Sequence, residues 1–292
     1  MMRTSSCRDK PEAKMVRTWF ITGVNSGFGR EMAEQLLGRG ERVAGTMRRP
    51  DDIADLKAKY GTNFWTAQLD LTDTAAVADV VNRAFHDLGR IDVVVNNAGY
   101  GQFGPVEGLS DEQIARQIDT NLIGPIHVVR AALPHLRRQG GGRLIAMSSY
   151  GGQATHPGAS LYHASKWGLE GFFDSVAAEV APLGIGVTIV EPGAARTAFR
   201  TTAGTLLGAD VDAYRNTSIG AMRAMLSNPG AVAKGDPGKM VQIIIDSVEM
   251  DPGPRRIALG GDAYTMIKRA LVERLAALEA QKDAAFATDV AR

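Results

Sequence analysis

A tyrosine and a lysine four residues apart could form a proton-transferring pair. Tyr162 and Lys166 lie in a helix-like pattern, where positions four apart share one face. A free tyrosine has a pKa of about 10 and is a poor base at neutral pH. An ammonium group within ~4 Å, worth on the order of 4 kcal/mol, could lower that pKa by several units before the opposing cost of desolvation is counted. Such a pair could exchange a proton with a carbinol oxygen near pH 7.

A serine upstream supplies the hydroxyl that this chemistry needs. Ser149 precedes Tyr162 by 13 residues and follows the apolar run 144–147. If this run is a strand, the serine lies at the carboxyl edge of the sheet, where open α/β sheets bind ligands. Its hydroxyl could donate a hydrogen bond to a substrate oxygen. Ser148 is the rival candidate, and the spacing favours Ser149.

A glycine-rich turn near the start of the chain is typical of a nucleotide site. The segment 22–29 reads Thr-Gly-Val-Asn-Ser-Gly-Phe-Gly and joins an apolar run to a helical pattern. Its glycines permit a tight turn and close approach to a pyrophosphate, which the helix N-terminus attracts. The same turn could merely connect two elements. The predicted cofactor contacts here are Gly23, Asn25, Ser26, Gly27, Phe28 and Gly29.

The end of the second apolar run favours NADP(H) over NAD(H). Sites of this kind often carry an acidic residue there, which holds the adenosine ribose, but this chain has Met47 followed by Arg48 and Arg49. A guanidinium group can hold the 2′-phosphate by charge-assisted hydrogen bonds, and a carboxylate would repel it. We assign Arg48 to this role, with Ser26 as a second donor. The alternative is that both arginines only solvate a loop.

Alternating strand and helix patterns place these residues on one framework. Continuous apolar runs indicate parallel strands covered on both faces, and helix-like segments separate them. We expect an α/β fold of the Rossmann type, with a doubly wound, mostly parallel, seven-stranded sheet and helices on both faces. The predicted strands are Thr18–Thr22, Arg42–Thr46, Phe64–Leu69, Ile91–Asn96, Arg143–Ser148, Gly186–Glu191 and Arg256–Leu259. The predicted helices include Gly29–Arg39, Ala75–Leu88, Ile114–Arg138, Ser160–Ala181, one from Asp236 through Val248, and Tyr264–Lys282.

One domain accounts for most of the chain. Residues 1–15 form a polar stretch that we expect to be a disordered leader, and residues 16–292 form a single oxidoreductase domain. Within that domain, 196–230 is predicted to cover the substrate, and 262–292 to form a C-terminal helix and tail.

Composition excludes several other classes of protein. Among 292 residues, Lys and Arg (33) nearly balance Asp and Glu (32), which gives no indication of a nucleic-acid or membrane-surface partner. No stretch approaches 18 consecutive apolar residues, so a transmembrane helix is not expected. The single cysteine, Cys7, fits a reducing compartment, and we expect a cytoplasmic protein. The histidines show no metal-ligand spacing, so no metal is expected.

Together the motifs resemble those of the short-chain dehydrogenase/reductase family, over roughly Arg17 to Thr197. They appear in family order: Thr22-Gly-x-x-x-Gly-x-Gly29, Asp70-Leu71, Asn96-Asn-Ala-Gly99, Asn121, Ser149, Tyr162-x-x-x-Lys166, and Pro192-Gly193 followed by Thr197. Each motif is weak alone, and the ordered set is highly specific.

The resemblance implies a role for each matched position. Asp70 and Leu71 would contact the adenine, and the residues Asn96, Asn97, Ala98 and Gly99 would line the cofactor beneath the ribose. Asn121 would hold a water that links Lys166 to solvent, and Lys166 would also bind the nicotinamide ribose. Pro192, Gly193 and Thr197 would hold the carboxamide. Two alternatives remain: Asn121 could be a helix-interior asparagine and Asp70 a helix cap. His163 and Glu191 are interpreted as structural.

These features predict an NADP(H)-dependent oxidoreductase that acts on a ketone, aldehyde or secondary alcohol, as a carbonyl reductase or alcohol dehydrogenase does. Tyr162 would be the general acid/base. The C-terminal stretch resembles the 17β-hydroxysteroid- and retinol-dehydrogenase-like branch of the family. This resemblance favours a homodimer or a monomer at least as much as a tetramer. An epimerase or dehydratase would need a larger substrate domain. A nucleotide-sensing module without turnover is the alternative from another class, and it predicts a damaged Asn/Ser/Tyr/Lys set.

Overall fold

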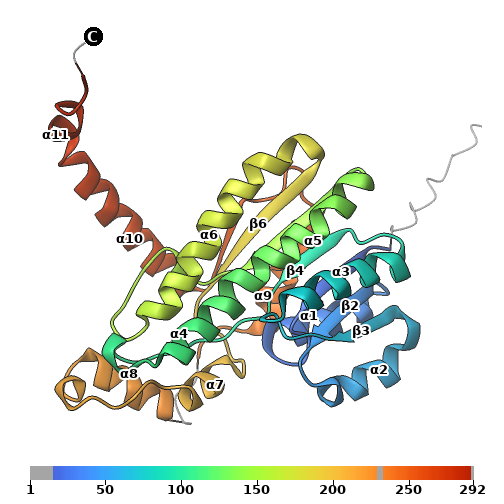
Figure 1. The fold of residues 1–292 in the computed structure, drawn as a ribbon, viewed down its shortest axis with the longest axis horizontal. Coiled ribbons are helices and arrows are strands. Elements are labelled where there is room, and N and C mark those ends of the chain that lie inside the picture. Colours follow the sequence, from blue (N-terminus) through green and yellow to red (C-terminus); the bar gives the residue numbers. More distant parts are fainter. Residues whose placement is uncertain (1–15, 229–232, 291–292) are drawn as a thin grey trace, which may run out of the picture.

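A single sheet of seven strands forms the centre of the computed structural model, which describes residues 16–228 and 233–290 (Figure 1). The strands run in the order β3-β2-β1-β4-β5-β6-β7, and each neighbouring pair is parallel. The predicted Rossmann-type fold is therefore confirmed, with a fully parallel sheet. The bounds are β1 (Thr18–Thr22), β2 (Arg42–Met47), β3 (Phe64–Gln68), β4 (Val93–Asn96), β5 (Gly142–Met147), β6 (Ile185–Pro192) and β7 (Arg256–Leu259).

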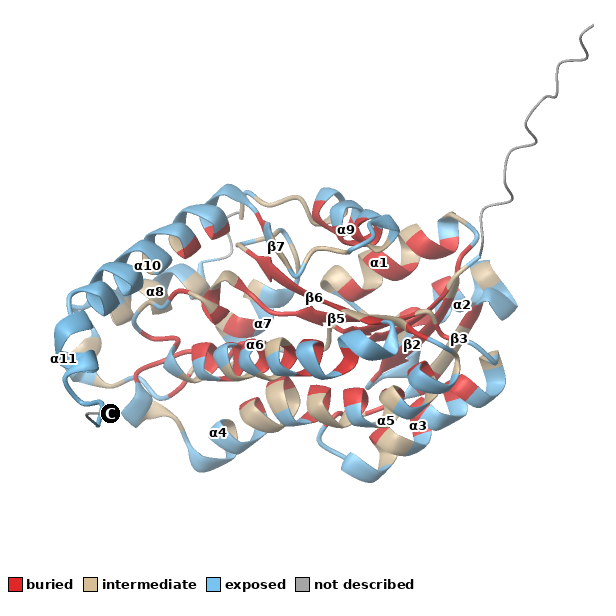
Figure 2. Cartoon of the chain, turned by 90° about the horizontal axis from the view of Figure 1, so that it is seen from above, coloured by how far each residue is buried: buried red, intermediate tan, exposed pale blue. Residues whose placement is uncertain are grey.

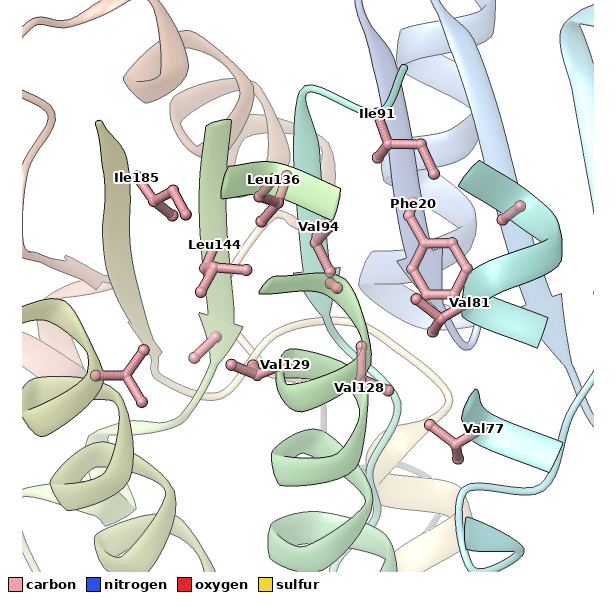
Figure 3. Close-up of a cluster of buried hydrophobic side chains, with 14 of the residues drawn as sticks. Phe20, Val77, Val81, Ile91, Val94, Val128, Val129, Leu136, Leu144 and Ile185 are labelled. Atoms are coloured by element: carbon pink, nitrogen blue, oxygen red, sulfur yellow. The ribbon is translucent and has the colours of Figure 1, made fainter. Parts of the chain in front are cut away.

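Helices cover both faces of this sheet (Figure 2). One face packs against α1 (Gly27–Gly38), α2 (Ala54–Tyr60) and α9 (Pro237–Asp246), and the other against α3 (Thr74–Leu88), α5 (Gly124–Arg138) and α6 (Ser160–Val180). Along β1, Trp19 and Ile21 face the first layer, whereas Phe20 faces the second. Because both faces are buried, the strands read as continuous apolar runs. Figure 3 shows Phe20, Val94 and Leu144 of the sheet against Val81 of α3 and Val128 of α5.

The strand order fixes where a ligand can bind. The chain moves outward from β1 to β3 and then crosses back to β4, so the loops after β1 and β4 diverge at the same edge. This is the topological switch point, where open α/β sheets hold their ligands. The loops after β5 and β6 reach the same carboxyl edge, which brings every motif of the sequence analysis to one side of the sheet.

The predicted helix Ile114–Arg138 is present in a modified form. It begins earlier, as α4 (Asp111–Ile118), where Ser110 and Gln113 form a capping box. A π-helical turn over Asp119–Ile123 then joins α4 to α5. Such turns are single-turn insertions that often mark functional sites, and Asn121 lies within this one. Helix α2 was not predicted, because a seven-residue segment gives too little periodicity to recognise.

The remaining helices belong to the last third of the chain. The predicted substrate cover contains α7 (Phe199–Thr205) and α8 (Ser218–Ser227), which pack on each other. Beyond β7, α10 (Gly261–Glu279) and α11 (Lys282–Phe286) extend away from the sheet (Figure 1). The expected leader, 1–15, lies outside the described residues, as do the ends of the cover (229–230) and of the tail (291–292).

Candidate active site

Ser149, Tyr162 and Lys166 converge at the carboxyl end of β5. Ser149 follows this strand, and its side chain accepts a hydrogen bond of 3.1 Å from the Gly151 amide. Tyr162 and Lys166 lie in the first two turns of α6, and the Tyr162 phenol is hydrogen-bonded to Ser149. All three side chains are buried. The rival, Ser148, instead donates to Glu170 at 2.6 Å, so the structure supports the choice of Ser149.

Lys166 is held by the strand that carries Ser149. Its Nζ donates to the Met147 carbonyl oxygen at 2.7 Å and lies 5.9 Å from the centroid of the Tyr162 ring. Burial lowers the pKa of Lys166 from 10.5 to about 8, and the Glu170 carboxylate opposes this change. A lysine with this pKa exchanges its proton close to neutral pH.

For the chain alone, the expectation of a lowered Tyr162 pKa is wrong. Burial raises the pKa of the phenol above its ordinary value, and the hydrogen bond from Ser149 only partly offsets this. The Lys166 ammonium lies near this ring, with Nζ 5.9 Å from its centroid. Desolvation therefore exceeds the ammonium's effect. A lowered pKa has to come from a change in this environment when the site fills.

Asn121 is fully engaged by protein groups. Its Nδ2 donates to the Tyr100 carbonyl oxygen at 2.8 Å and to Ser165 Oγ at 3.1 Å, and its Oδ1 accepts from the Tyr100 amide at 3.1 Å. The side chain thus ties the π-helical turn to α6 and to the loop after β4. A Cβ on Gly99 would lie 3.1 Å from Asn121 Oδ1 and 3.7 Å from Lys166 Nζ, so the loop after β4 lies directly against both of these side chains. A water held by Asn121 stays a prediction.

The glycine-rich turn is locked to the end of β4. Gly23 and Gly27 have φ angles of +75° and +56°, the left-handed region that favours glycine. A Cβ on Gly29 would overlap the Gly23 carbonyl oxygen. Asn97 Nδ2 donates to the carbonyl oxygens of Thr22 (2.8 Å) and Gly23 (3.1 Å). These contacts fix the shape of the turn at the N-terminus of α1.

Thr22 is the first residue of the glycine-rich motif, and its supporting role was not predicted from the sequence. Its hydroxyl accepts hydrogen bonds of 3.0 Å from the amides of both Asn97 and Ala98, so one side chain joins the turns after β1 and β4. Asn96, at the end of β4, is buried, and neither polar atom of its amide has a partner in the described structure. An orphaned buried amide at the switch point fits a bound dinucleotide.

The nucleotide end carries an exposed arginine. Arg48 follows β2, and within the described residues its guanidinium is in no ion pair. Arg49, in contrast, donates to Asp52 at 3.2 Å, and Asn25 Nδ2 donates to the same carboxylate at 3.0 Å. The side-chain amide of Asn25 is thus already engaged through Nδ2, and its contact with the cofactor stays a prediction. Ser26 is exposed, and its side chain caps no helix.

Asp70 and Leu71 lie beside this end. Asp70 Oδ1 accepts from the Thr72 amide (3.0 Å) and hydroxyl (2.9 Å), whereas the cap of α3 is Asp73. Burial would raise the pKa of Asp70, but the Thr72 hydrogen bonds, with Arg48 and Arg116 nearby, hold it below its ordinary value. Leu71 is buried against Gly124, at the start of α5. The helix-cap alternative for Asp70 is thus excluded, and a turn-forming role is shown.

The loop after β6 returns toward the glycine-rich turn. Pro192 ends the strand, and the Gly193 amide donates to the Leu259 carbonyl oxygen at 2.8 Å. A Cβ on Gly27 would lie 3.7 Å from Thr197 Cβ, which places Thr197 over the start of α1. Asp262, at the start of α10, was not predicted to contribute: its carboxylate accepts from the Ala194 amide at 2.8 Å and holds this loop.

Aromatic side chains cover Tyr162. The ring of Phe103 lies 5.5 Å, and that of Phe199 5.7 Å, from the ring of Tyr162. Phe199 comes from α7, so the predicted substrate cover contacts the predicted acid/base directly. Leu207 and Met222 pack against the same cluster, whereas Met225 is half exposed.

The described residues, 16–228 and 233–290, contain neither a membrane-spanning helix nor a metal-ligand cluster. None of the helices there is long and apolar enough to cross a membrane. In the same part of the chain, no group of three or more His, Cys, Asp or Glu side chains is arranged to hold a metal ion.

Comparison with known proteins agrees with this geometry. The family model described as short chain dehydrogenase matches residues 17–205. The chain is 34% identical over 250 residues to oxidoreductase BOA17 of Botryotinia fuckeliana, which covers 85% of this chain and 90% of that protein. It is 33% identical over 247 residues to retinol dehydrogenase 8 of Bos taurus, covering 79% of this chain and 78% of that one.

Among solved structures, a short-chain dehydrogenase from Streptomyces avermitilis superposes with a TM-score of 0.85 at 34% identity. The match covers 94% of this chain and all (100%) of that one. With the family model matching more than half of the sequence and the sheet reproducing the fold, the chain belongs to the short-chain dehydrogenase family.

Proposed function

We propose that the protein is an NADP(H)-dependent oxidoreductase that interconverts a carbonyl compound and a secondary or primary alcohol. The observation that carries this proposal is the convergence of Ser149, Tyr162 and Lys166 at the edge of the sheet that carries the glycine-rich turn, with Asn121 bracing the loop after β4. We take residues 16–292 as one catalytic unit in which 196–230 covers the substrate. Bound NADP(H) supplies or accepts the hydride.

Each residue of the group has a distinct task. Ser149 donates a hydrogen bond to the substrate oxygen and fixes it beside the phenol. Tyr162 gives a proton to that oxygen during reduction and takes it back during oxidation. Lys166, with a pKa of about 8, binds the nicotinamide ribose and returns the proton to Tyr162 through groups near Asn121. The segment from Asn96 to Gly99 lines the cofactor site beneath the ribose. Pro192, Gly193 and Thr197 hold the carboxamide of the nicotinamide.

The preference for NADP(H) rests on Arg48. A buried methionine, Met47, occupies the end of β2, so no carboxylate there repels a phosphate. Arg48 is exposed beside Asp70 and free of ion pairs with the described residues, which leaves its guanidinium available for a 2′-phosphate. The apolar cover of Phe103, Phe199, Leu207 and Met222 suits an apolar carbonyl or alcohol of moderate size. Association into a homodimer stays a prediction.

A Tyr162→Phe variant tests the acid/base assignment. Because only the hydroxyl is removed, the variant should bind NADPH with the wild-type Kd. It should lose turnover on any ketone, aldehyde, quinone or steroid that the wild type reduces, and this turnover is measured by the absorbance of NADPH. The nucleotide-sensing alternative predicts instead that the wild type binds NADPH tightly and turns over none of these compounds. Retained turnover in the variant would remove Tyr162 from the mechanism.

A further inference from the structure

A buried ionic cluster lies directly behind the proposed active site. Three acidic side chains converge on Arg256 of β7: Glu170 and Asp174 from α6, and Glu191 from β6. One guanidinium nitrogen, Nη1, contacts both Glu170 and Glu191, the latter at 2.6 Å. Glu170 is 2% and Glu191 3% exposed, whereas the Asp174 side chain is 43% exposed. Two carboxylates therefore share a single positive partner away from water.

Glu170 holds both sides of the Ser149 loop. Ser148, immediately before Ser149, donates its hydroxyl to Glu170 Oε1 at 2.6 Å. Gln153, after it, donates its side-chain amide to Oε2 of the same carboxylate. Between them, a Cβ on Gly152 would overlap this carboxylate, so the loop is packed directly onto it. Since Glu170 lies one turn after Lys166 on α6, one helix carries Tyr162, Lys166 and the anchor for Ser149.

Glu191 connects the same cluster to the cofactor loop. It is the residue immediately before Pro192 and Gly193, and its strand pairs with β7, where Glu191 lies beside Ala258. Arg256 therefore links two segments. Through Glu170 it is connected to the Ser149 loop (148–153), and through Glu191 to the cofactor loop (192–193), which is proposed to hold the carboxamide. A structural role for Glu191 alone, as the sequence suggested, leaves this connection unexplained.

The charges around the pair make it sensitive to pH. Burial and the negative charge of Glu170 raise the pKa of Glu191 to about 7, and Arg256 offsets this only in part. The other charged groups facing the cluster are Lys166 and Asp174 on α6, and Arg255 beside Asp174. Arg274 of α10 reaches it through Gln153, at 3.2 Å. Glu191 thus changes its protonation near neutrality, while Arg256 stays charged.

We propose that Glu170 and Glu191 are positioning residues, which through Arg256 keep the Ser149 loop and the cofactor loop in the relative placement that the reaction needs. This inference rests on the proposed function, because it assigns the two loops to substrate and cofactor. When Glu191 is ionised, both carboxylates hold Arg256 and both loops are fixed. When Glu191 is protonated, Arg256 loses the charge of one of its two buried carboxylates, and the cofactor loop loses this one tie to the cluster, although the Gly193 and Ala194 amides still hold it.

Three isosteric variants test this: Glu170→Gln, Glu191→Gln and, as the matched control, Asp174→Asn. We measure kcat, KM and the Kd for NADPH from pH 6 to 9, together with the melting temperature. Glu170→Gln should lower kcat at least about tenfold, because it removes a charged acceptor from both sides of Ser149. Glu191→Gln should abolish the limb centred near pH 7 in the kcat and NADPH Kd profiles. Asp174→Asn, which contacts neither loop, should stay within about twofold of wild type.

The outcomes separate the two levels of inference. If the wild type is active and Glu170→Gln and Glu191→Gln keep its pH profile and kcat, the positioning role is wrong and the function stands. A fall in melting temperature alone, with unchanged profiles, also overturns it, since a merely structural role would do that. If the wild type binds NADPH but reduces nothing, the proposed function fails, and the NADPH Kd profile alone decides the cluster: a limb lost in Glu191→Gln supports it, and an unaltered limb contradicts it.

Discussion

Replacing Lys166 by methionine should change how the stability of the cofactor-free protein depends on pH. Lys166 is buried, its Nζ donates a hydrogen bond to the Met147 carbonyl oxygen, and its pKa falls from 10.5 to about 8 on folding because burial disfavours the charged form. A difference of this size corresponds to about 3 kcal/mol of unfolding free energy. The fold therefore carries a cost for holding a charged lysine where the proposed chemistry needs one.

The direction of the effect follows from proton binding. Between pH 8 and 10.5 the unfolded chain keeps the lysine proton and the folded chain releases it, so the free energy of unfolding rises with pH in this window. Below about pH 8 both states are protonated, and the full cost remains. In Lys166→Met this titration is absent. The stability of wild type relative to the variant should therefore increase by about 3 kcal/mol from pH 7 to above 10.5.

Urea unfolding of both proteins at several pH values measures this difference. The change with pH is more informative than either absolute value, because Lys166→Met also leaves the Met147 carbonyl oxygen without its donor, at a cost of about 1–3 kcal/mol at all pH values. Lys282→Met, on the exposed α11, is the matched control and should run parallel to wild type. Parallel curves for Lys166→Met and wild type would refute the reasoning, since the buried lysine would then titrate as in the unfolded chain.

Two further substitutions test the cofactor site. Arg48→Asp should reduce the preference for NADPH over NADH, measured as a ratio of Kd values, by about 10- to 100-fold. Arg49→Asp should change this ratio less, because the Arg49 guanidinium is already held by Asp52. An unchanged ratio in Arg48→Asp would mean that Arg48 does not contact the phosphate. Gly29→Ala should lower the unfolding free energy by about 1–3 kcal/mol and weaken NADPH binding, because its Cβ overlaps the Gly23 carbonyl oxygen. Gly171→Ala, with open space around an exposed helical position, should instead gain about 0.5–1 kcal/mol, and equal stabilities of the two variants would contradict the steric argument.

The parts of the site that follow from local sequence could be predicted well. The glycine-rich turn is defined by backbone angles and by its place between a strand and a helix, and in the structure Gly23 and Gly27 have the positive φ angles that such a tight turn needs. The spacing of Tyr162 and Lys166 needs only helical periodicity, and Ser149 needs only the end of a buried run. For the same reason the seven strands lie within a few residues of their predicted bounds.

What could not be predicted depends on contacts between distant segments. The π-helical turn at Asn121 inserts one residue without breaking the apolar pattern, so the sequence reads as one helix. Glu170 and Arg256 each look like a surface charge in sequence, and only the pairing of β6 with β7 brings them together. The raised pKa of Tyr162 could not be predicted, because its burial under Phe103 and Phe199 depends on a loop and on α7, whose placement no local pattern specifies.

Because aromatic side chains cover Tyr162, the ring of Phe199 and the proposed substrate compete for one surface. One is tethered: Phe199 lies against the Tyr162 ring, which is only 8% exposed. Under the proposed function, a carbonyl that approaches the phenol from the Phe199 side must displace this ring, so its apparent affinity equals the intrinsic affinity reduced by the fraction of molecules already open. A compound with a ring of its own can replace the contact that Phe199 gives up, and an aliphatic one of equal size cannot do so as well. Under the proposed function, substrate selectivity then depends on the displacement of Phe199 as well as on the shape of the pocket that remains.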